Sequence, residues 1–250
     1  MKVVISPAKK LDFETEAIVN ETTCPQLMEK THPLIKKLKT LSSDDIAKLM
    51  KLSSTLSELN YTRFQNFTKS KLIKPAAYAF NGDTYTGLDF YTFNKSQVKY
   101  AQKHLKILSG LYGILRPLDE IKPYRLEMGT RFGTEGAKNL YDYWSNDVTK
   151  ILNKDLKQDE ILINCASQEY FKVINQKNLK AKIITPVFKE MKNGEYKIIS
   201  FNAKKARGMM ANYILKNKLN KLSDILTFDH DSYQYNKKLS TEDEVVFTRG

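Results

Sequence analysis

The pair Asn193 and Gly194 restricts the fold more than any other feature of the sequence, because it is the strongest hairpin signal in the chain. Apolar runs flank it at 183–188 and 196–201, which predicts two antiparallel strands. Further strands are predicted at 3–5, 76–80, 161–165 and 245–247, and helices at 96–108 and 203–219. We therefore expect a mixed α/β (α+β) fold, a single compact domain over residues 1–250 with helices around a mixed sheet.

The composition fits a globular protein of a reducing compartment. Hydrophobic residues make up 41% of the 250 residues, which is enough for a core without disulfides. Cys24 and Cys165 have no companion at metal-ligand or redox-motif spacing. The first apolar run is cut short by Pro7, so neither a secretory signal nor a membrane span is expected. The sequence thus predicts a cytoplasmic protein without a membrane partner.

The net charge of +13 is concentrated in one segment. Residues 176–222 contain twelve basic and two acidic side chains, whereas residues 223–250 are net acidic. Such asymmetry favours an anionic partner such as nucleic acid. The alternative is an ordinary lysine-rich surface, and composition does not separate the two.

The densest part of this charge lies where a helix is expected to begin. Asn202 is a good N-cap, yet Lys204, Lys205 and Arg207 follow it, at the end of the helix that already carries partial positive charge. A phosphate placed there would meet free backbone N–H groups and three cations, so we predict a phosphate site. Gly208 would allow another backbone or a ligand to approach closely. The alternative is a later helix start, with the lysines in a solvated loop.

A second candidate phosphate site lies between Gly110 and Gly113. Two helices joined by a glycine hairpin can hold a nucleic-acid phosphate on their backbone amides. Arg116, Arg125 and Arg131 follow and suit phosphate oxygens. The alternative is an ordinary turn.

The predicted strand ends carry polar groups that leave enzymatic chemistry open. Ser6 and Lys9 follow the first strand, and a polar cluster at 166–170 follows another. Several acids and phenols lie in turn-like stretches, namely Asp83, Tyr85, Asp119, Glu127, Glu169 and Tyr170. No catalytic pair is assigned from them. No cofactor or metal site is expected, because the three histidines are scattered and nucleotide-binding glycine motifs are absent from the sequence.

Five segments together resemble the YaaA family of bacterial peroxide stress resistance proteins: residues 5–9 (ISPAK), 81–88 (NGDTYTGL), 108–119 (LSGLYGILRPLD), 123–129 (PYRLEMG) and 203–208 (AKKARG). The resemblance extends over nearly the whole chain. It implies a cytosolic protein with a positively charged cleft, a helix-hairpin-helix element and DNA binding, in a cell that defends itself against hydrogen peroxide and free iron. Residues 110–113 are the candidate helix-hairpin-helix, and Lys204, Lys205 and Arg207 fit the basic cleft.

Our leading hypothesis is a DNA-binding stress protein that contacts the phosphate backbone, largely independently of sequence, and protects against iron-dependent damage. The predicted phosphate-binding residues are Lys9, Gly110, Gly113, Arg116, Arg125, Lys204, Lys205 and Arg207. The alternative is an enzyme for a phosphate-bearing or nucleotide-like ligand held in the same cleft by Lys9, Arg116 or Arg207. A third hypothesis, iron binding, has only the stress context of the family to support it.

Overall fold

A computed structural model of the chain describes residues 1–19, 21–157 and 160–250. Its main sheet is mixed and has the strand order β11-β12-β9-β8-β1-β5-β6, with β10 paired to β9. The strands of this sheet are β1 (Lys2–Ile5), β5 (Leu105–Ser109), β6 (Gly113–Leu115), β8 (Ile161–Cys165), β9 (Lys182–Lys192), β10 (Glu195–Lys197), β11 (Gln234–Tyr235) and β12 (Glu244–Arg249). Two small ribbons pair β2 (Lys10–Leu11) with β4 (Phe80–Asn81), and β3 (Lys74–Pro75) with β7 (Glu120–Ile121).

The centre of the sheet is parallel, and its strands are buried on both faces. β1 pairs in parallel with β5 on one side and with β8 on the other, and β9 continues the parallel order. Val3, Val4 and Ile5 are completely buried, as a continuous apolar run in a parallel sheet requires. The mixed α/β fold is thereby confirmed, as are the predicted strands at 3–5, 161–165 and 245–247.

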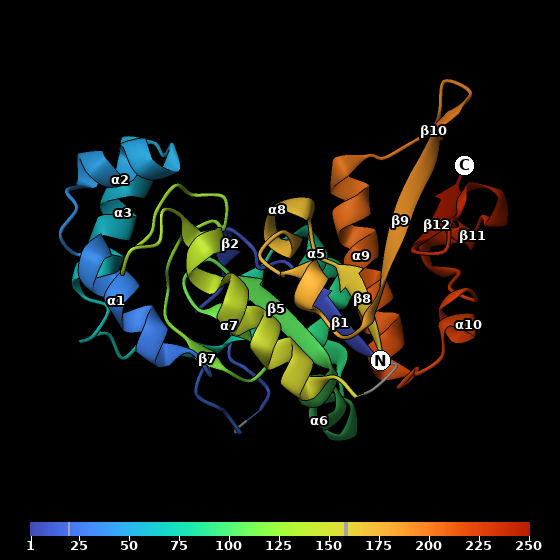
Figure 1. The fold of residues 1–250 in the computed structure, drawn as a ribbon, viewed down its shortest axis with the longest axis horizontal. Helices are drawn as coiled ribbons and strands as arrows, with labels where there is room; N and C mark the ends of the chain where they lie inside the picture. The colour runs from blue at the N-terminus through green and yellow to red at the C-terminus, as the bar shows by residue number, and fades with distance from the viewer. Residues whose placement is uncertain (20, 158–159) are drawn as a thin grey trace.

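Helices cover both faces of this sheet (Figure 1). α5 and α9 pack against each other, and α9 lies on β1, β8 and β9, whereas α7 and α8 appear in front of the sheet. The helices are α1 (Met28–Leu38), α2 (Ser43–Met50), α3 (Ser54–Gln65), α4 (Ala76–Ala79), α5 (Asp83–Leu88), α6 (Lys95–His104), α7 (Leu140–Asp155), α8 (Gln168–Phe171), α9 (Ser200–Lys216) and α10 (Leu222–Ile225). Among the described residues, none of these helices is long and apolar enough to cross a bilayer.

The hairpin predicted from Asn193 and Gly194 is confirmed, although its second strand ends at Lys197 and not at residue 201, because α9 begins at Ser200. Lys192 pairs with Glu195, so the two residues form the whole loop between β9 and β10. Both have positive φ angles, +55° and +79°, which a two-residue hairpin turn of the primed type requires and which Asn and Gly tolerate best. The chain runs along β9 to the hairpin, turns back through β10 and continues into α9. β9 and α9 therefore run in opposite directions (Figure 1).

One predicted helix is confirmed except at its C-terminal end, and one predicted strand is wrong. The helix predicted at 96–108 ends at His104, and the chain continues as the buried strand β5. Leu105 and Leu108 continue the helical spacing of Val98 and Ala101, so this period does not separate the helix from the strand that follows it. The strand predicted at 76–80 is mostly the short helix α4, because Ala has high helix propensity and only Phe80 enters a strand.

Candidate functional site

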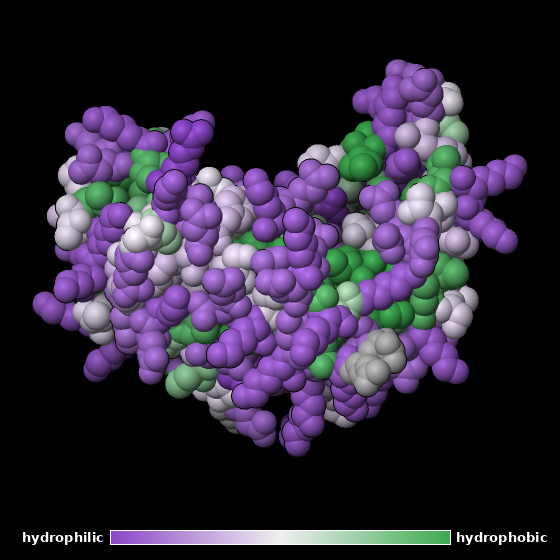
Figure 2. Space-filling view, viewed as in Figure 1, coloured by the Kyte–Doolittle hydropathy of each residue, from purple (hydrophilic) through white to green (hydrophobic). Residues whose placement is uncertain are grey.

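The carboxyl ends of the parallel strands form one edge of the sheet, and we call the surface above them the carboxyl-end face. The chain leaves β1 toward β5 on one side and leaves β8 toward β9 on the other. The connections therefore diverge between β1 and β8, and in open α/β sheets ligands bind outside the strand ends at such a switch point. Figure 2 shows that the outline of the molecule is hollowed at this end, between α2 and α3 on one side and the β9–β10 hairpin on the other.

Two serines close the gap between β1 and β8 at the switch point. The Ser167 N–H donates a hydrogen bond of 2.9 Å to Ser6 Oγ, and the two hydroxyl oxygens lie 3.3 Å apart. Ser6 is the first residue after β1, and Ser167 is the second residue after β8. The pairing of these two strands therefore fixes the distance between the serines. The parallel pairing of β1 and β8 thus brings together the polar groups that follow the two strands.

Three buried phenols line the space behind these serines. Tyr85 OH donates to the Ser6 carbonyl at 3.2 Å, and Tyr124 OH lies 2.6 Å from Ser109 Oγ. Burial raises the pKa of Tyr85, Tyr124 and Tyr170 well above the ordinary value of a phenol. The three hydroxyl groups therefore stay protonated at neutral pH and act as hydrogen-bond partners, not as bases.

A charge cluster joins two of the predicted phosphate-binding residues. Glu127 Oε1 lies 3.3 Å from Lys9 Nζ and 3.0 Å from Arg125 Nη2. Lys9 keeps 67% of its side-chain surface exposed, so a ligand on this face has access to it. The structure thus brings Lys9 and Arg125 together on one carboxylate, and their contact with phosphate stays a prediction.

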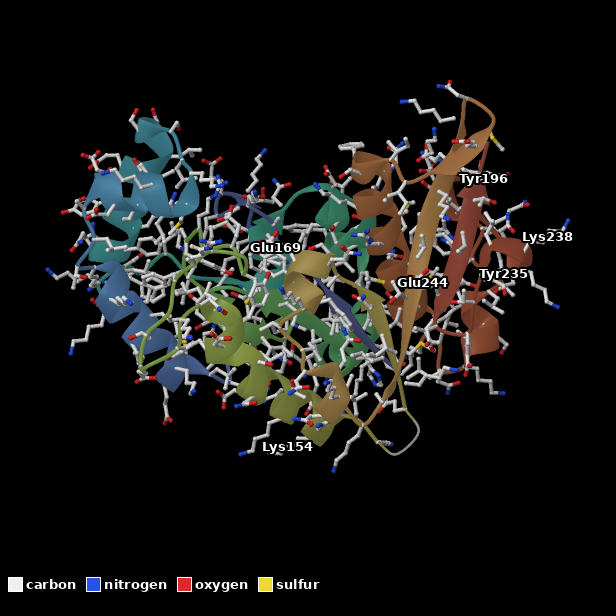
Figure 3. The ribbon with its side chains drawn as sticks, turned by 45° about the horizontal axis from the view of Figure 1, so that its top comes forward. Lys154, Glu169, Tyr196, Tyr235, Lys238 and Glu244 are labelled. Atoms are coloured by element: carbon white, nitrogen blue, oxygen red, sulfur yellow. The ribbon has the colours of Figure 1, made fainter. Side chains whose placement is uncertain are left out.

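Glu169 lies on α8 at the centre of the carboxyl-end face, and Tyr196 marks the β9–β10 hairpin at its margin (Figure 3). Glu169 Oε1 accepts a hydrogen bond of 3.0 Å from the Gly129 N–H, and its carbonyl accepts one from Tyr141 OH. The carboxylate therefore orders the 123–129 segment against α8.

Arg207 reaches the same edge from α9. It is half-buried next to Cys165 at the end of β8, and it forms no hydrogen bond or ion pair with the residues that the structure describes. Burial lowers the pKa of Arg207 and raises the pKa of the Cys165 thiol to about 12. Cys165 is thus a protonated, unreactive thiol, whereas Arg207 is a cation without a partner.

The start of α9 differs from the sequence prediction. The helix begins at Ser200, without a side-chain cap, and Asn202 lies inside it and donates to Glu190 Oε2 at 3.1 Å. Lys204 is exposed, and Lys205 Nζ lies 3.7 Å from Asp231 Oδ2. The expected N-cap at Asn202 is therefore wrong, because its amide pairs with a carboxylate on β9 that a local reading of the sequence does not reveal.

Gly208 permits the close contact that the sequence predicted. A Cβ on Gly208 would lie 1.9 Å from the Thr84 carbonyl oxygen, and a Cβ on Gly87 would lie 2.0 Å from that of Lys205. The two glycines therefore let α5 and α9 pack backbone against backbone. The neighbour of Gly208 is α5, not a ligand.

The structure divides the basic segment 176–222 into two groups. Because β9 rises to the hairpin and α9 descends from it, six cations lie toward the hairpin and six toward the opposite end. The hairpin group consists of Lys189, Lys192, Lys197, Lys204, Lys205 and Arg207, and the opposite group of Lys177, Lys180, Lys182, Lys216, Lys218 and Lys221. The basic segment is continuous in the sequence, but only six of its twelve cations lie toward the hairpin end of the molecule.

The helix-hairpin-helix expected at residues 110–113 is wrong. This segment is the turn of a buried β-hairpin between β5 and β6. A Cβ on Gly110 would lie 2.2 Å from the Leu126 carbonyl oxygen, and Gly113, at φ +69°, lies against the Trp144 ring. Both glycines are needed for packing inside the core, which leaves no helix end on which a phosphate could sit.

Arg116 likewise has an internal partner. Its guanidinium binds the Asp119 carboxylate, with an Nη2–Oδ1 distance of 2.8 Å, and the Cys24 carbonyl at 2.9 Å. The Asp119 side chain is completely buried and also accepts from Thr23 Oγ1. Arg116 therefore neutralises a buried carboxylate, a role that its sequence neighbours did not indicate. Across the described residues, no cluster of three or more His, Cys, Asp and Glu is placed to hold a metal ion.

Comparison with known proteins gives a consistent result over the whole chain. A family profile described as peroxide stress protein YaaA matches residues 1–239. A UPF0246 protein of Saccharophagus degradans is 52% identical, with 100% of this chain and 99% of that protein covered. UPF0246 proteins of Alteromonas mediterranea and Idiomarina loihiensis are 50% and 47% identical, each over 100% of this chain and 98% of the relative.

Proposed function

We propose that this chain, which belongs to the peroxide stress protein YaaA family, binds DNA through the phosphate backbone, largely independently of sequence. The family name supports a role in peroxide stress. The observation that carries the DNA proposal is that six cations of β9, β10 and α9 lie toward the hairpin, and this hairpin forms one margin of the hollow seen in Figure 2. That hollow would be the basic cleft that receives the duplex.

The availability of these cations supports the proposal. Lys192 and Lys204 are exposed and form no ion pair with the described residues, and Arg207 has no carboxylate partner. Lys197 pairs with Glu195 on its own short strand, and both side chains are exposed. Exposed pairs are worth little, so phosphate can replace the carboxylate at small cost.

The test compares two variants with the same change in charge. One replaces Lys192, Lys197 and Lys204 of the hairpin group by Gln, and the matched control replaces Lys177, Lys180 and Lys221 of the opposite group. Binding to duplex DNA is measured from low to high salt. We expect the hairpin variant to flatten the slope of log K against log salt by about 0.9 for each lost contact, and the control to leave it unchanged. Equal effects of both variants would show that bulk charge, not this face, attracts DNA.

We also propose that bound protein protects DNA from iron-dependent oxidation. Cations condense on DNA phosphates, and a protein that neutralises those phosphates displaces these cations from the DNA. Plasmid nicking by ferrous iron and hydrogen peroxide should fall as the protein covers the DNA. The hairpin variant should lose this protection, and full protection by that variant would contradict the mechanism.

A second candidate function rests on the switch point itself. The two serine hydroxyls and Arg207, which lies beside Cys165, are at the ends of β1 and β8, where α/β sheets bind small ligands. This position favours a phosphate-bearing or nucleotide-like ligand. Thermal-shift measurements with nucleoside monophosphates should show saturable stabilisation that Arg207→Met abolishes. The absence of any stabilisation would remove this candidate and leave the DNA proposal unaffected.

A further inference from the structure

A cavity of about 800 Å³ lies away from the switch point, between α3 and the segment that follows β1. Residues 10–15 form one wall, α3 and the loop after it form another, and Lys122 and Pro123 close the end. The volume is in the range of small-molecule sites. None of the groups assigned to DNA or to the switch point lines it.

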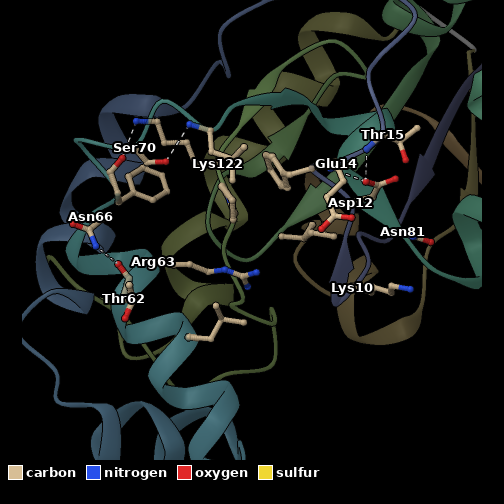
Figure 4. A pocket seen from close by; sticks show the side chains of 16 residues that line it. Lys10, Asp12, Glu14, Thr15, Thr62, Arg63, Asn66, Ser70, Asn81 and Lys122 are labelled. Carbon is tan, nitrogen blue, oxygen red and sulfur yellow. Dashed lines mark hydrogen bonds between the residues drawn. The ribbon is translucent and has the colours of Figure 1, made fainter.

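Arg63 is the only guanidinium in this cavity. Figure 4 shows its side chain extending from α3 into the space toward residues 10–15. It is half-buried, and its one hydrogen bond is a long one, 3.4 Å from Nη1 to Asn60 Oδ1. No described carboxylate forms an ion pair with it. A partly desolvated cation without a counter-charge is unfavourable by itself, so an anion would stabilise it.

Of the other charged groups of the wall, Asp12 and Lys122 are held by main-chain partners, whereas Lys10 and the exposed Glu14 form no ion pair with the described residues. Asp12 Oδ1 accepts the N–H groups of Glu14 and Thr15 at 2.9 and 3.0 Å. These bonds lower the pKa of Asp12 to about 2, so it stays ionised where it is. Lys122 Nζ donates to the Phe67 carbonyl at 2.7 Å, and Lys10 points away from Arg63 in Figure 4. Among the described lining residues, Arg63 is therefore the cation that extends into the cavity without a counter-charge.

Apolar side chains complete the wall. Leu59 on α3 is 44% exposed and Leu72 is 49% exposed, and both line the cavity together with the half-buried Phe13. The cavity wall thus has an apolar part, formed by Leu59 and Leu72, and a charged group, the Arg63 guanidinium. A ligand that covers the leucines gains apolar burial, at about 25 cal/mol for each Å².

We propose that this cavity binds a small amphipathic anion, a carboxylate on an aliphatic body. The carboxylate pairs with the Arg63 guanidinium, and the aliphatic body covers Leu59 and Leu72. A single carboxylate matches the one guanidinium that extends into the cavity, whereas a phosphate dianion would need a second cation directed at the same place.

The experiment measures binding of decanoate, decanol and inorganic phosphate to the full chain by calorimetry, below the micelle concentration of decanoate. We expect decanoate to bind saturably at one site. Decanol should bind with an affinity lower by about tenfold or more, because it cannot form the ion pair. Arg63→Met should weaken decanoate about tenfold and remove its advantage over decanol. Leu72→Ser should weaken both decanoate and decanol.

The controls separate this site from the others. Arg207→Met removes the second unpaired, half-buried arginine and should leave decanoate binding unchanged, and Arg63→Met should leave the salt slope of DNA binding unchanged. Arg63→Lys, which keeps the charge, should retain part of the affinity and excludes misfolding as the cause. The proposal is overturned if decanoate does not saturate, if Arg63→Met or Leu72→Ser has no effect on decanoate, or if inorganic phosphate binds as tightly.

Discussion

The β5–β6 hairpin and the start of α9 look alike in the sequence but differ in the structure. Each combines glycine with basic residues, Gly110, Gly113 and Arg116 in the first region and Lys204 and Gly208 in the second. In the hairpin the glycines are buried and Arg116 binds the buried Asp119. At the start of α9 the glycine packs on α5, while Lys204 faces solvent without a carboxylate. The comparison teaches that a cation indicates a binding site only when the fold has not already supplied its counter-charge.

The largest effect that tests this difference is expected for Asp119→Ala. The change leaves the Arg116 guanidinium and the Thr23 hydroxyl without their acceptor in a buried place. Breaking such a pair costs about 3–5 kcal/mol in the free energy of unfolding. Arg207→Met in the other region should change stability by less than about 1 kcal/mol, because no pair is lost. Urea denaturation of both variants is the measurement, and similar losses would break the comparison.

Gly208→Ala is expected to be nearly as harmful. The added Cβ would meet the Thr84 carbonyl, a backbone atom that cannot move away as a flexible side chain would. Overpacking of this kind costs about 1–3 kcal/mol or more. Gly110→Ala should behave alike in the first region, since its Cβ meets the Leu126 carbonyl. The control is Gly194→Ala, where space is open and only the positive φ is penalised, at about 1 kcal/mol.

Each region has one of the two cysteines as a neighbour, and the two should differ in reactivity. Cys24 beside Arg116 is exposed, whereas Cys165 beside Arg207 is buried and its thiol pKa is raised to about 12. At pH 8 only roughly one Cys165 thiol in ten thousand is a thiolate. Iodoacetamide followed by mass spectrometry should modify Cys24 and spare Cys165 in the folded protein. Equal labelling would mean that the switch point opens to solvent.

The smallest effect on stability is expected for Lys204→Gln. The side chain is exposed and without an ion pair, so the free energy of unfolding should change by less than about 0.5 kcal/mol. The salt slope of DNA binding should nevertheless fall by about 0.9, the value for one phosphate contact. An unchanged slope would place the DNA elsewhere and make the two regions equivalent in function.

Much of the sheet was predictable, because local chemistry decides it. Val3 to Ile5 can only be buried, and Asn193 with Gly194 favours one turn geometry. β5 was missed, because Leu105 and Leu108 continue the helical spacing of the preceding helix. The Arg63 cavity also escaped prediction, since Arg63 and the wall at residues 10–15 are far apart in the chain and the sequence gives no sign that they meet.

The sequence by itself determined the mixed α/β class, the hairpin, the polar strand ends and the excess of positive charge. Only the tertiary structure decided which charges remain free. It placed Asp119 under Arg116, Glu127 between Lys9 and Arg125, and no carboxylate on Arg63 or Arg207 among the described residues. The physical reason is that propensity and turn chemistry act between near neighbours, whereas a counter-charge is supplied by whichever distant segment the packing brings within a few ångströms.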